Sequence, residues 1–276
     1  MQKITLTLLA LMLTLSASAK NPYKKYTEKL PFAMQEVKAP KIPNRQVALD
    51  APIPQPAANK ASQLCTDMLQ AAIDQLAEQG GGHVVLKAGV WLSGPIELRS
   101  NIDLHLEQGA VLQFAGDESL YKLVKTSFEG LDTRRCQSPI SGRNLENVSI
   151  TGDGVIDGNG QYWRPVKKSK VTEAHWKSLL AIPGSVELKK DYWVPSEGYA
   201  KGESGANMNV PAAKTEAEWQ AVKRFLRPVM VSLVGCKNVL LQGVIFQNSP
   251  AWNLHPLMCE NIIIDNVLVR NPAYAQ

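Results

Sequence analysis

The sequence predicts an all-β protein folded as a parallel β-helix, a solenoid of stacked coils. The chain has 276 residues and 45% hydrophobic content, enough to bury a large core. Glycine, proline, asparagine and β-branched residues divide it into short runs, which favours strands over long helices. The segment CKNVLLQGVIFQN from Cys236 aligns with CENIIIDNVLVRN from Cys259. A repeat this short cannot form a core alone, so it indicates stacked coils.

The repeat has a period of 23 residues, the offset from Cys236 to Cys259. Strands of successive coils should therefore pair about 4.8 Å apart, with like residues in vertical ladders. The aligned pairs are Asn238 with Asn261, Asn248 with Asn271, and the inward positions Val239 with Ile262, Leu241 with Ile264, Val244 with Val267 and Phe246 with Val269. A leucine-rich repeat is excluded because its Leu-x-x-Leu-x-Leu consensus is missing.

Earlier copies of the repeat are recognisable by the asparagine. Asn101 and Asn147 are separated by 46 residues, which we interpret as two periods. From Asn147 to Asn238 the separation is 91 residues, close to four periods, but an unlike segment intervenes, so this near-match can be a coincidence.

Residues 1–19 have the features of a signal peptide. One charge at Lys3 precedes an apolar run, and Ala17-Ser18-Ala19 fits a signal-peptidase site before Lys20. A transmembrane anchor needs about 20 apolar residues, and this run is shorter. We therefore expect an exported protein, periplasmic or extracellular.

Residues 20–60 are rich in proline and lysine without a sustained period, which predicts an extended arm. The β-helix domain is then expected over residues 61–276. It should open with a capping helix that ends at Gly80–Gly82. The apolar stripe of that helix comprises Leu64, Met68, Leu69, Ala72, Ile73 and Leu76. After it, the sequence from His83 alternates apolar and polar residues in strand-like runs.

Residues 161–227 break the repeat and predict a long loop insertion on one face of the solenoid. Thr215 and Glu218 have the spacing of a capping box, so a helix should begin there. The insertion contains Trp163, Trp176, Trp193 and Trp219. These aromatic side chains could stack on sugar rings, or they could form a small core of the insertion itself.

The four cysteines allow two interpretations. Cys236 and Cys259 should stack on adjacent coils, within disulfide range in an oxidising compartment, or remain as two buried thiols. Cys65 and Cys136 have no evident partner in the sequence. No Cys-x-x-Cys or Cys/His spacing suggests a metal site, and no cofactor is expected.

The net charge of the chain excludes few classes of function. Without the leader the chain has 29 basic and 25 acidic residues, a net charge of +4. This mild excess would help to attract a polyanion, although exported proteins often carry such a charge for solubility. No basic run with interleaved aromatics points to nucleic acid, and no later segment could span a membrane.

Three stretches, taken in order, resemble glycoside hydrolase family 28, the polygalacturonases and their relatives. They are AIDQLAEQGGGHVVLKAGVWLSGPIELRSNIDLHLEQGAVLQF, NVSITGDGVIDGNGQYW and RPVMVSLVGCKNVLLQGVIFQNSPAWNLHP, within residues 63–276. The resemblance implies a right-handed parallel β-helix with a helix at its N-terminal end. It also implies hydrolysis of α-linked galacturonide bonds in pectin, with inversion.

The catalytic motifs of that family do not occur in the sequence. They are an Asn-Thr-Asp motif, an Asp-Asp pair, a Gly-His-Gly and an Arg-x-Lys, and the register of the repeat places the first directly beyond Gln276. No catalytic residue is therefore assigned. Asp153 and Asp157 lie in a glycine-rich turn, where aspartates commonly cap backbone amides, and His83 is interpreted as structural.

Two residues are candidates for substrate binding. His255 and Trp252 should lie one coil below the expected aspartate, where Trp252 would stack on a sugar and His255 would donate to a hydroxyl or carboxylate. The alternatives are a packing residue at a coil corner and a structural histidine. Arg227 and Lys237 are weaker candidates.

The sequence thus supports two hypotheses. In the first, the chain is an incomplete copy of a pectin-degrading hydrolase, inactive by itself, whose partner is a pectic polysaccharide (polygalacturonate or rhamnogalacturonan) and which is a monomer when full length. In the second, it is a non-catalytic β-helix that binds acidic polysaccharide. A solenoid interrupted in mid-stack should also fray or aggregate.

Overall fold

The computed structural model describes residues 21–51, 64–207 and 209–272. The chain divides into two compact units, with the boundary between Lys38 and Ala39. The predicted signal peptide, residues 1–19, lies outside the described residues. In the first unit, α1 (Lys24–Thr27) is a single helical turn. The Asn21 side chain connects the two ends of this unit, because it donates to Glu36 Oε1 at 3.0 Å and to the Val37 carbonyl at 2.7 Å.

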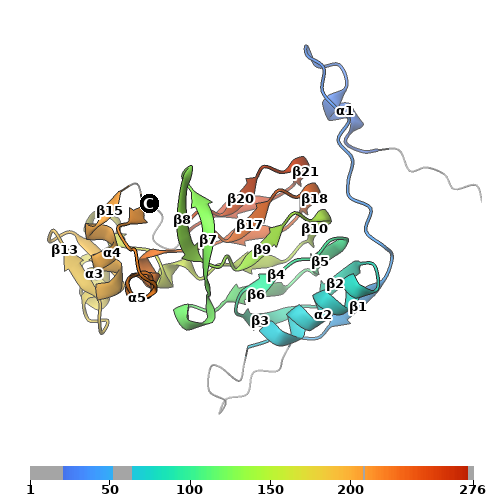
Figure 1. The fold of residues 1–276 in the computed structure, drawn as a ribbon. Coiled ribbons are helices and arrows are strands. Elements are labelled where there is room, and N and C mark those ends of the chain that lie inside the picture. Colours follow the sequence, from blue (N-terminus) through green and yellow to red (C-terminus); the bar gives the residue numbers. More distant parts are fainter. Residues whose placement is uncertain (1–20, 52–63, 208, 273–276) are drawn as a thin grey trace, which may run out of the picture. The chain divides into compact units, whose positions relative to one another are not determined.

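The second unit is a parallel β-helix with three sheets (Figure 1). The first sheet comprises β1 (Gln46–Leu49), β2 (Gly82–Leu86), β5 (Ile102–Leu106), β10 (Glu146–Gly152), β18 (Lys237–Gln242) and β21 (Glu260–Asp265). The second comprises β3 (Gly89–Ser93), β6 (Ala110–Phe114), β11 (Val155–Asp157), β19 (Ile245–Gln247) and β22 (Leu268–Arg270). The third comprises β4 (Ile96–Glu97), β9 (Ile140–Arg143), β17 (Val231–Val234) and β20 (Leu254–Leu257). From β2 onward the chain visits the three sheets in turn, and the predicted fold class is confirmed.

A ladder of asparagine side chains holds successive coils in register. The Asn261 amide donates to Asn238 at 2.6 Å, Asn238 donates to Asn147 at 3.1 Å, and Asn147 donates to Asn101 at 2.9 Å. All four have left-handed backbones with φ between 55° and 62°. Asparagine tolerates this conformation better than most residues, and its amide can donate and accept at once. Asn238 and Asn261 are therefore vertical neighbours, as predicted.

The spacing of the earlier copies was misinterpreted. Val148 pairs with Ile102, so the 46 residues from Asn101 to Asn147 form one coil rather than two. The extra length is an antiparallel hairpin of β7 (Leu123–Phe128) and β8 (Leu131–Cys136), preceded by the 3₁₀ turn η2 (Glu118–Leu120). Likewise Val148 pairs with Val239, so the 91-residue separation is also one coil. Strand pairing fixes the register, and the length of an excursion leaves it unchanged.

The core is a stack of inward apolar side chains. On the second sheet, Trp91, Leu112, Ile156 and Phe246 occupy one ladder and are fully buried. Three of the predicted inward pairs on the last two coils are confirmed by register: Val239 with Ile262, Leu241 with Ile264 and Phe246 with Val269. On the last described coil these side chains are more exposed: Ile264 is 53% and Val269 46% exposed. Among the described strands, β20, β21 and β22 are the outer strands of the three sheets at the C-terminal end of the solenoid.

Helix α2 (Thr66–Glu78) packs on the N-terminal end of this core, as predicted. Leu69, Ala72, Ile73 and Leu76 are buried there. Met68 is 40% exposed, so its predicted place in the stripe was wrong, and Cys65 is buried with the stripe instead. Strand β1 was also missed within the predicted arm, because four residues between prolines are too short to show a period.

The long insertion is a folded subdomain rather than a loop. It contains α3 (Glu173–Leu180), α4 (Glu197–Ser204), α5 (Glu216–Ala221), the 3₁₀ turns η3 (Gly160–Tyr162), η4 (Lys168–Lys170) and η5 (Lys223–Phe225), and two small antiparallel sheets. Their strands are β12 (Val166–Lys167), β13 (Val186–Leu188) and β14 (Tyr192–Val194), and β15 (Ala206–Asn207) and β16 (Val210–Pro211).

Three of the tryptophans of the insertion, Trp163, Trp176 and Trp193, are at most 3% exposed. Trp176 and Trp193 share one core cluster of the insertion, and Trp219 packs against another. For these three the structure shows the insertion's own core, whereas Trp163 packs on Tyr121 and Cys136, outside the insertion. The capping box of Thr215 and Glu218 is present at the start of α5.

Both excursions leave the solenoid at the same corner. The β7–β8 hairpin lies between β6 and β9, and the long insertion lies between β11 and β17, so each joins the second sheet to the third. The β7–β8 hairpin and the long insertion consequently both lie beside the third sheet (Figure 1).

All four cysteines are free thiols in the structure. Cys236 and Cys259 stack as predicted, and the Cys259 thiol donates to the Leu233 carbonyl at 3.3 Å. Burial raises the pKa of Cys65 to about 11 and that of Cys136 to about 12, so both stay protonated near neutral pH.

The asparagine ladder predicts a specific loss of stability. Asn147→Ala removes two side-chain hydrogen bonds, each contributing about 1 kcal/mol, and places alanine in a left-handed conformation that costs roughly 1 kcal/mol more. We expect the free energy of unfolding to fall by about 2–3 kcal/mol in urea titrations. Asn147→Gly keeps the backbone conformation accessible and should lose less. An alanine variant as stable as the parent chain would contradict the role of the ladder.

Candidate binding groove

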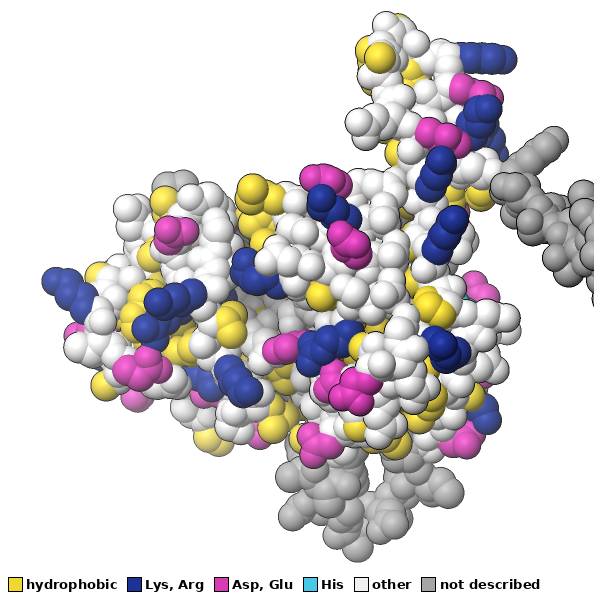
Figure 2. Space-filling model, turned by 45° about the vertical axis from the view of Figure 1, so that its right-hand side comes forward, with side chains coloured by type: hydrophobic (Ala, Val, Ile, Leu, Met, Phe, Trp, Pro, Cys, Tyr) yellow, Lys and Arg dark blue, Asp and Glu magenta, His cyan; other side chains and the backbone are white. Residues whose placement is uncertain are grey.

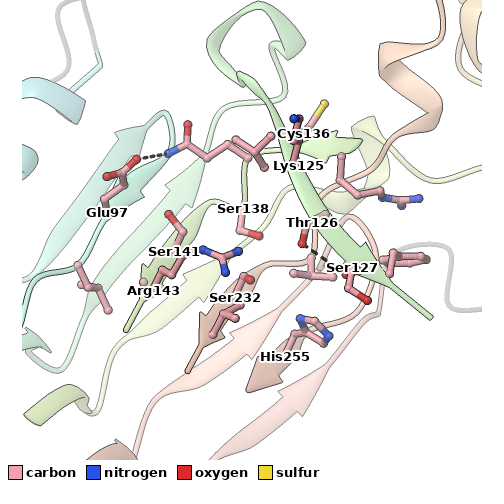
Figure 3. A pocket seen from close by; sticks show the side chains of 18 of the residues that line it. Glu97, Lys125, Thr126, Ser127, Cys136, Ser138, Ser141, Arg143, Ser232 and His255 are labelled. Atoms are coloured by element: carbon pink, nitrogen blue, oxygen red, sulfur yellow. Dashed lines mark hydrogen bonds between the residues drawn. The ribbon is translucent and has the colours of Figure 1, made fainter. Parts of the chain in front are cut away.

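A groove of about 360 Å³ lies on the outer face of the third sheet, with the β7–β8 hairpin beside it (Figure 3). Its floor comes from β4, β9, β17 and β20, which alternate inward and outward side chains. Outward positions on parallel strands in register stack at the strand spacing of about 4.8 Å. A ligand lying across the strands would therefore meet one side chain per coil.

Four polar side chains form such a row along the floor. Glu97 pairs with Ser141, Ser141 with Ser232, and Ser232 with His255, so one residue comes from each of four successive coils. Of the predicted residues, His255 lies in this row. Ser232 precedes it by 23 residues, so the repeat period could have identified it; Ser141 and Glu97 are hidden by the excursions.

The groove is predominantly basic. Arg99, Lys125, Arg135 and Arg143 line it, whereas Glu97 is the only carboxylate among the described residues that do so. The Arg143 guanidinium points into the groove beside Ser138 and Ser232 (Figure 3). In the part of the chain that the structure describes, neither the Arg143 nor the Lys125 side chain has a hydrogen-bonded or ion-pair partner. Figure 2 shows basic side chains over the insertion and the adjacent coils, with acidic ones between them.

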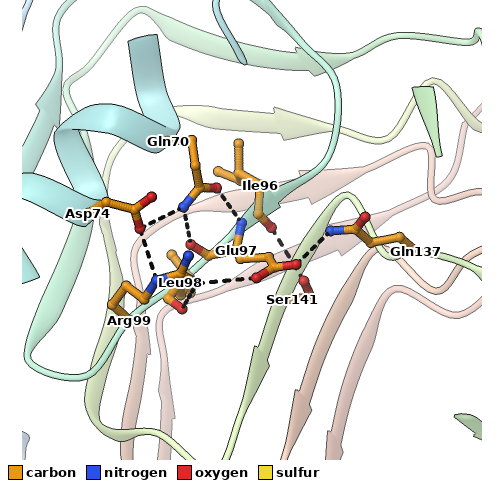
Figure 4. Close-up of polar contacts among 8 residues, drawn as sticks. All are labelled: Gln70, Asp74, Ile96, Glu97, Leu98, Arg99, Gln137 and Ser141. Carbon is orange, nitrogen blue, oxygen red and sulfur yellow. Dashed lines mark hydrogen bonds and ion pairs between the residues drawn. The ribbon is translucent and has the colours of Figure 1, made fainter. Parts of the chain in front are cut away.

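The end of the groove at β4 is fixed by polar contacts from the capping helix (Figure 4). Gln70 on α2 donates to the Glu97 carbonyl at 3.0 Å and accepts from the Glu97 amide at 2.8 Å, so its side chain pairs like a neighbouring strand. Asp74 on the same helix pairs with Arg99 at 2.9 Å. Glu97 in turn contacts Arg99 and Gln137, each at 3.3 Å. These contacts close an exposed sheet edge and position the two charged groups.

The hairpin is anchored by a buried arginine. Arg135 is 4% exposed and donates to the Arg227 carbonyl through Nε at 2.9 Å and Nη2 at 2.6 Å. Its guanidinium also lies 3.8 Å from the centre of the Phe128 ring. Burial, and then repulsion from Arg227, lower the pKa of Arg135, which nevertheless remains charged at neutral pH. Arg135 therefore holds the wall of the groove against the insertion.

His255 is partly buried at the far end of the floor. Its Nδ1 has no hydrogen-bond partner among the described residues. Burial lowers its pKa, so the imidazole is neutral near pH 7. A neutral imidazole can donate or accept toward a ligand hydroxyl, which suits a binding role better than charge attraction does.

Trp252 lies beside the groove rather than in its lining. Its ring stacks on Phe128 with centroids 4.8 Å apart and an interplanar angle of 23°, and it contacts His255 at 5.4 Å. One ring face is thus used to hold the hairpin, although 43% of the residue stays exposed. Substrate binding by His255 and Trp252 stays a prediction.

The weaker candidates are placed elsewhere. Arg227 donates to the Pro250 carbonyl at 3.1 Å and does not line the groove, and Lys237 pairs with Glu260 at 3.5 Å on the first sheet. Asp157 is 6% exposed and accepts from the Asn159 amide at 2.7 Å, in keeping with a structural turn aspartate. It also accepts from Gln247 at 2.7 Å.

Known proteins similar to this chain are polygalacturonases. A probable polygalacturonase of Vitis vinifera is 26% identical over 218 residues, 76% of this chain and 34% of that protein. An endo-polygalacturonase of Pectobacterium carotovorum subsp. carotovorum is 30% identical over 135 residues, 47% of this chain and 32% of that protein. The chain is therefore polygalacturonase-like. No protein-family model matches it.

Solved structures agree in fold. A hyperthermoactive exopolygalacturonase from Thermotoga maritima matches with a TM-score of 0.57 and 29% identity, over 86% of this chain and 50% of that one. A family 28 exopolygalacturonase of Yersinia enterocolitica matches with a TM-score of 0.53 and 20% identity, over 78% of this chain and 38% of that one, and shows the fold alone. The chain spans about a third of the length of the curated relatives that it matches.

The environment of His255 predicts its titration. Because burial disfavours the charged imidazole, its NMR titration midpoint should lie below the ordinary value of about 6.5. The unfolded chain then binds the proton more readily, so this group favours folding above pH 6.5 and loses that contribution as pH falls. A His255 midpoint at or above about 6.5 would contradict the burial.

Proposed function

We propose that this chain is part of a pectin-degrading glycoside hydrolase of the polygalacturonase type and that the groove on the third sheet binds acidic pectic polysaccharide. The similar proteins support the substrate class. The observation that carries the proposal is the unpaired Arg143 guanidinium over a row of serine and histidine side chains. Arginine binds carboxylates in a bidentate manner, and hydroxyl and imidazole groups bind sugar hydroxyls.

The described residues supply binding groups rather than a complete catalytic set. Inverting hydrolysis needs a carboxylic acid and a carboxylate about 6.5–9.5 Å apart. Glu97 is the one carboxylate lining the described groove, and it is already paired with Arg99 and Gln137. We therefore infer that the 276-residue chain alone binds pectic polymers without cleaving them. The same observation favours the alternative, a non-catalytic binding protein.

An exported, monomeric protein is part of this proposal. The leader-like residues 1–19 and the polymeric substrate both support export. In the part of the chain that the structure describes, no helix is long and apolar enough to cross a membrane.

Arg143 gives the direct test. Replacing it with glutamine removes a charge-assisted contact of about 1.5–3 kcal/mol, so trigalacturonate should bind roughly ten- to a hundredfold more weakly in calorimetry. Lys177→Gln is the matched control, because it removes one positive charge from an exposed site on α3 outside the groove. The parent chain should release no reducing ends above a buffer control.

Three results would count against the proposal. Equal losses in the two variants would mean that only net charge matters, and no heat with the parent chain would remove the binding site. Reducing ends released by the purified chain would require a pair of acids within it.

A further inference from the structure

A second groove, of about 830 Å³, lies on the outer face of the first sheet, away from the basic groove. Its wall comes from the segment around Ile42, and Val85 and Leu240 form apolar parts of its floor. Among the described residues that line it there is no lysine or arginine. The lining polar side chains are two imidazoles, three carboxylates, and amides and hydroxyls: Asn44, Gln46, His83, Asp103, His105, Ser149, Thr151, Asp153, Gln242, Asp265 and Asn266.

Four of these side chains form one connected network across three coils. His83 Nδ1 lies 2.8 Å from Asp103 Oδ2, and Asp103 is only 3% exposed. The Thr151 hydroxyl lies 2.9 Å from both oxygens of Asp103, and His105 Nδ1 lies 2.8 Å from that hydroxyl. The network is thus anchored on one buried carboxylate.

The network determines which nitrogen of each ring carries the proton. An ionised carboxylate only accepts, so His83 donates to Asp103 through Nδ1–H. The single proton of the Thr151 hydroxyl is also donated to Asp103, so its oxygen must accept from Nδ1–H of His105. In the neutral rings, Nε2 of His83 and Nε2 of His105 are then the unprotonated nitrogens.

We propose that this groove binds a neutral oligosaccharide, whose hydroxyl groups donate hydrogen bonds to Nε2 of His83 and of His105. The apolar floor of Val85 and Leu240 suits the C–H face of a sugar ring. Asn44 and Gln46 add amides that can donate and accept. This inference does not depend on the function proposed for the basic groove.

The charge of the lining side chains favours a neutral sugar over an acidic one. Without a cation, three lining aspartates disfavour an acidic sugar by repulsion, in contrast to the groove on the third sheet. A metal ion is a poorer fit, because no group of three or more histidine, cysteine or carboxylate side chains in the described residues could hold one. A polyol fits better, because its hydroxyl groups can donate hydrogen bonds to the lone pairs on Nε2 of His83 and of His105.

Calorimetry on the whole chain with trisaccharides of galactose and of arabinose tests the proposal, with trigalacturonate as the acidic comparison. We expect at least one neutral trisaccharide to bind. His105→Phe should weaken its binding about tenfold, the equivalent of one lost hydrogen bond, and leave trigalacturonate binding unchanged. His105→Gln, which can retain an acceptor, should lose less, and Lys177→Gln should lose nothing.

Imidazole ¹⁵N spectra of the unmodified chain test the same claim without a substitution. Both His83 and His105 should show Nδ1–H tautomers, and their Nε2 resonances should shift on addition of the neutral trisaccharide. Failure of both neutral sugars to bind, Nε2–H tautomers, or undiminished binding by the folded His105→Phe variant would each overturn the proposal. Trigalacturonate binding that depends on His105 would show that the ligand class is wrong.

Discussion

The structure depends on one constraint, the parallel pairing of each strand with its equivalent one coil away. Backbone hydrogen bonds fix the strand spacing, and the asparagine ladder from Asn101 to Asn261 fixes where each coil turns. With the register set, like side chains stack, so the apolar ladders fill the core and the outward rows become continuous surfaces. The floors of both grooves are outward rows of this kind.

The excursions turn one of these surfaces into a groove. The hairpin and the insertion both leave where the second sheet passes to the third. Arg135 of the hairpin donates to the Arg227 carbonyl at the end of the insertion, and Phe128 of the hairpin stacks on Trp252 of the solenoid. On the opposite side, α2 closes the edge of the sheet through Gln70 and Asp74. The chemistry of the two outer faces consequently differs: the flanked face is basic, whereas the lining of the first-sheet groove holds no lysine or arginine.

The sequence was informative wherever the repeat was uninterrupted. The offset between Cys236 and Cys259 predicted the fold, the vertical neighbours and the inward positions of the last coils, and the stripe around Leu69 predicted the capping helix. It failed where an excursion was counted as coils, because length alone cannot distinguish two short coils from one coil with a hairpin. Arg143 was missed for that reason: its alignment with Val234 depends on pairing across 91 residues. The His83–Asp103–Thr151–His105 network was likewise not recognised, because its members become neighbours only through the pairing of β5 with β2 and with β10.

The stacking of coils is tested most directly by the register between β9 and β17, which lie on either side of the long insertion. Cysteines placed at Ser141 and Ser232, in a chain whose own cysteines are replaced by serine, should form a disulfide on mild oxidation, because paired residues on adjacent parallel strands lie within bonding distance. Cysteines at Ser141 and Val234, two residues out of register on the same face, should not. Efficient bonding of the second pair, with none in the first, would contradict the stacking from which both grooves are derived.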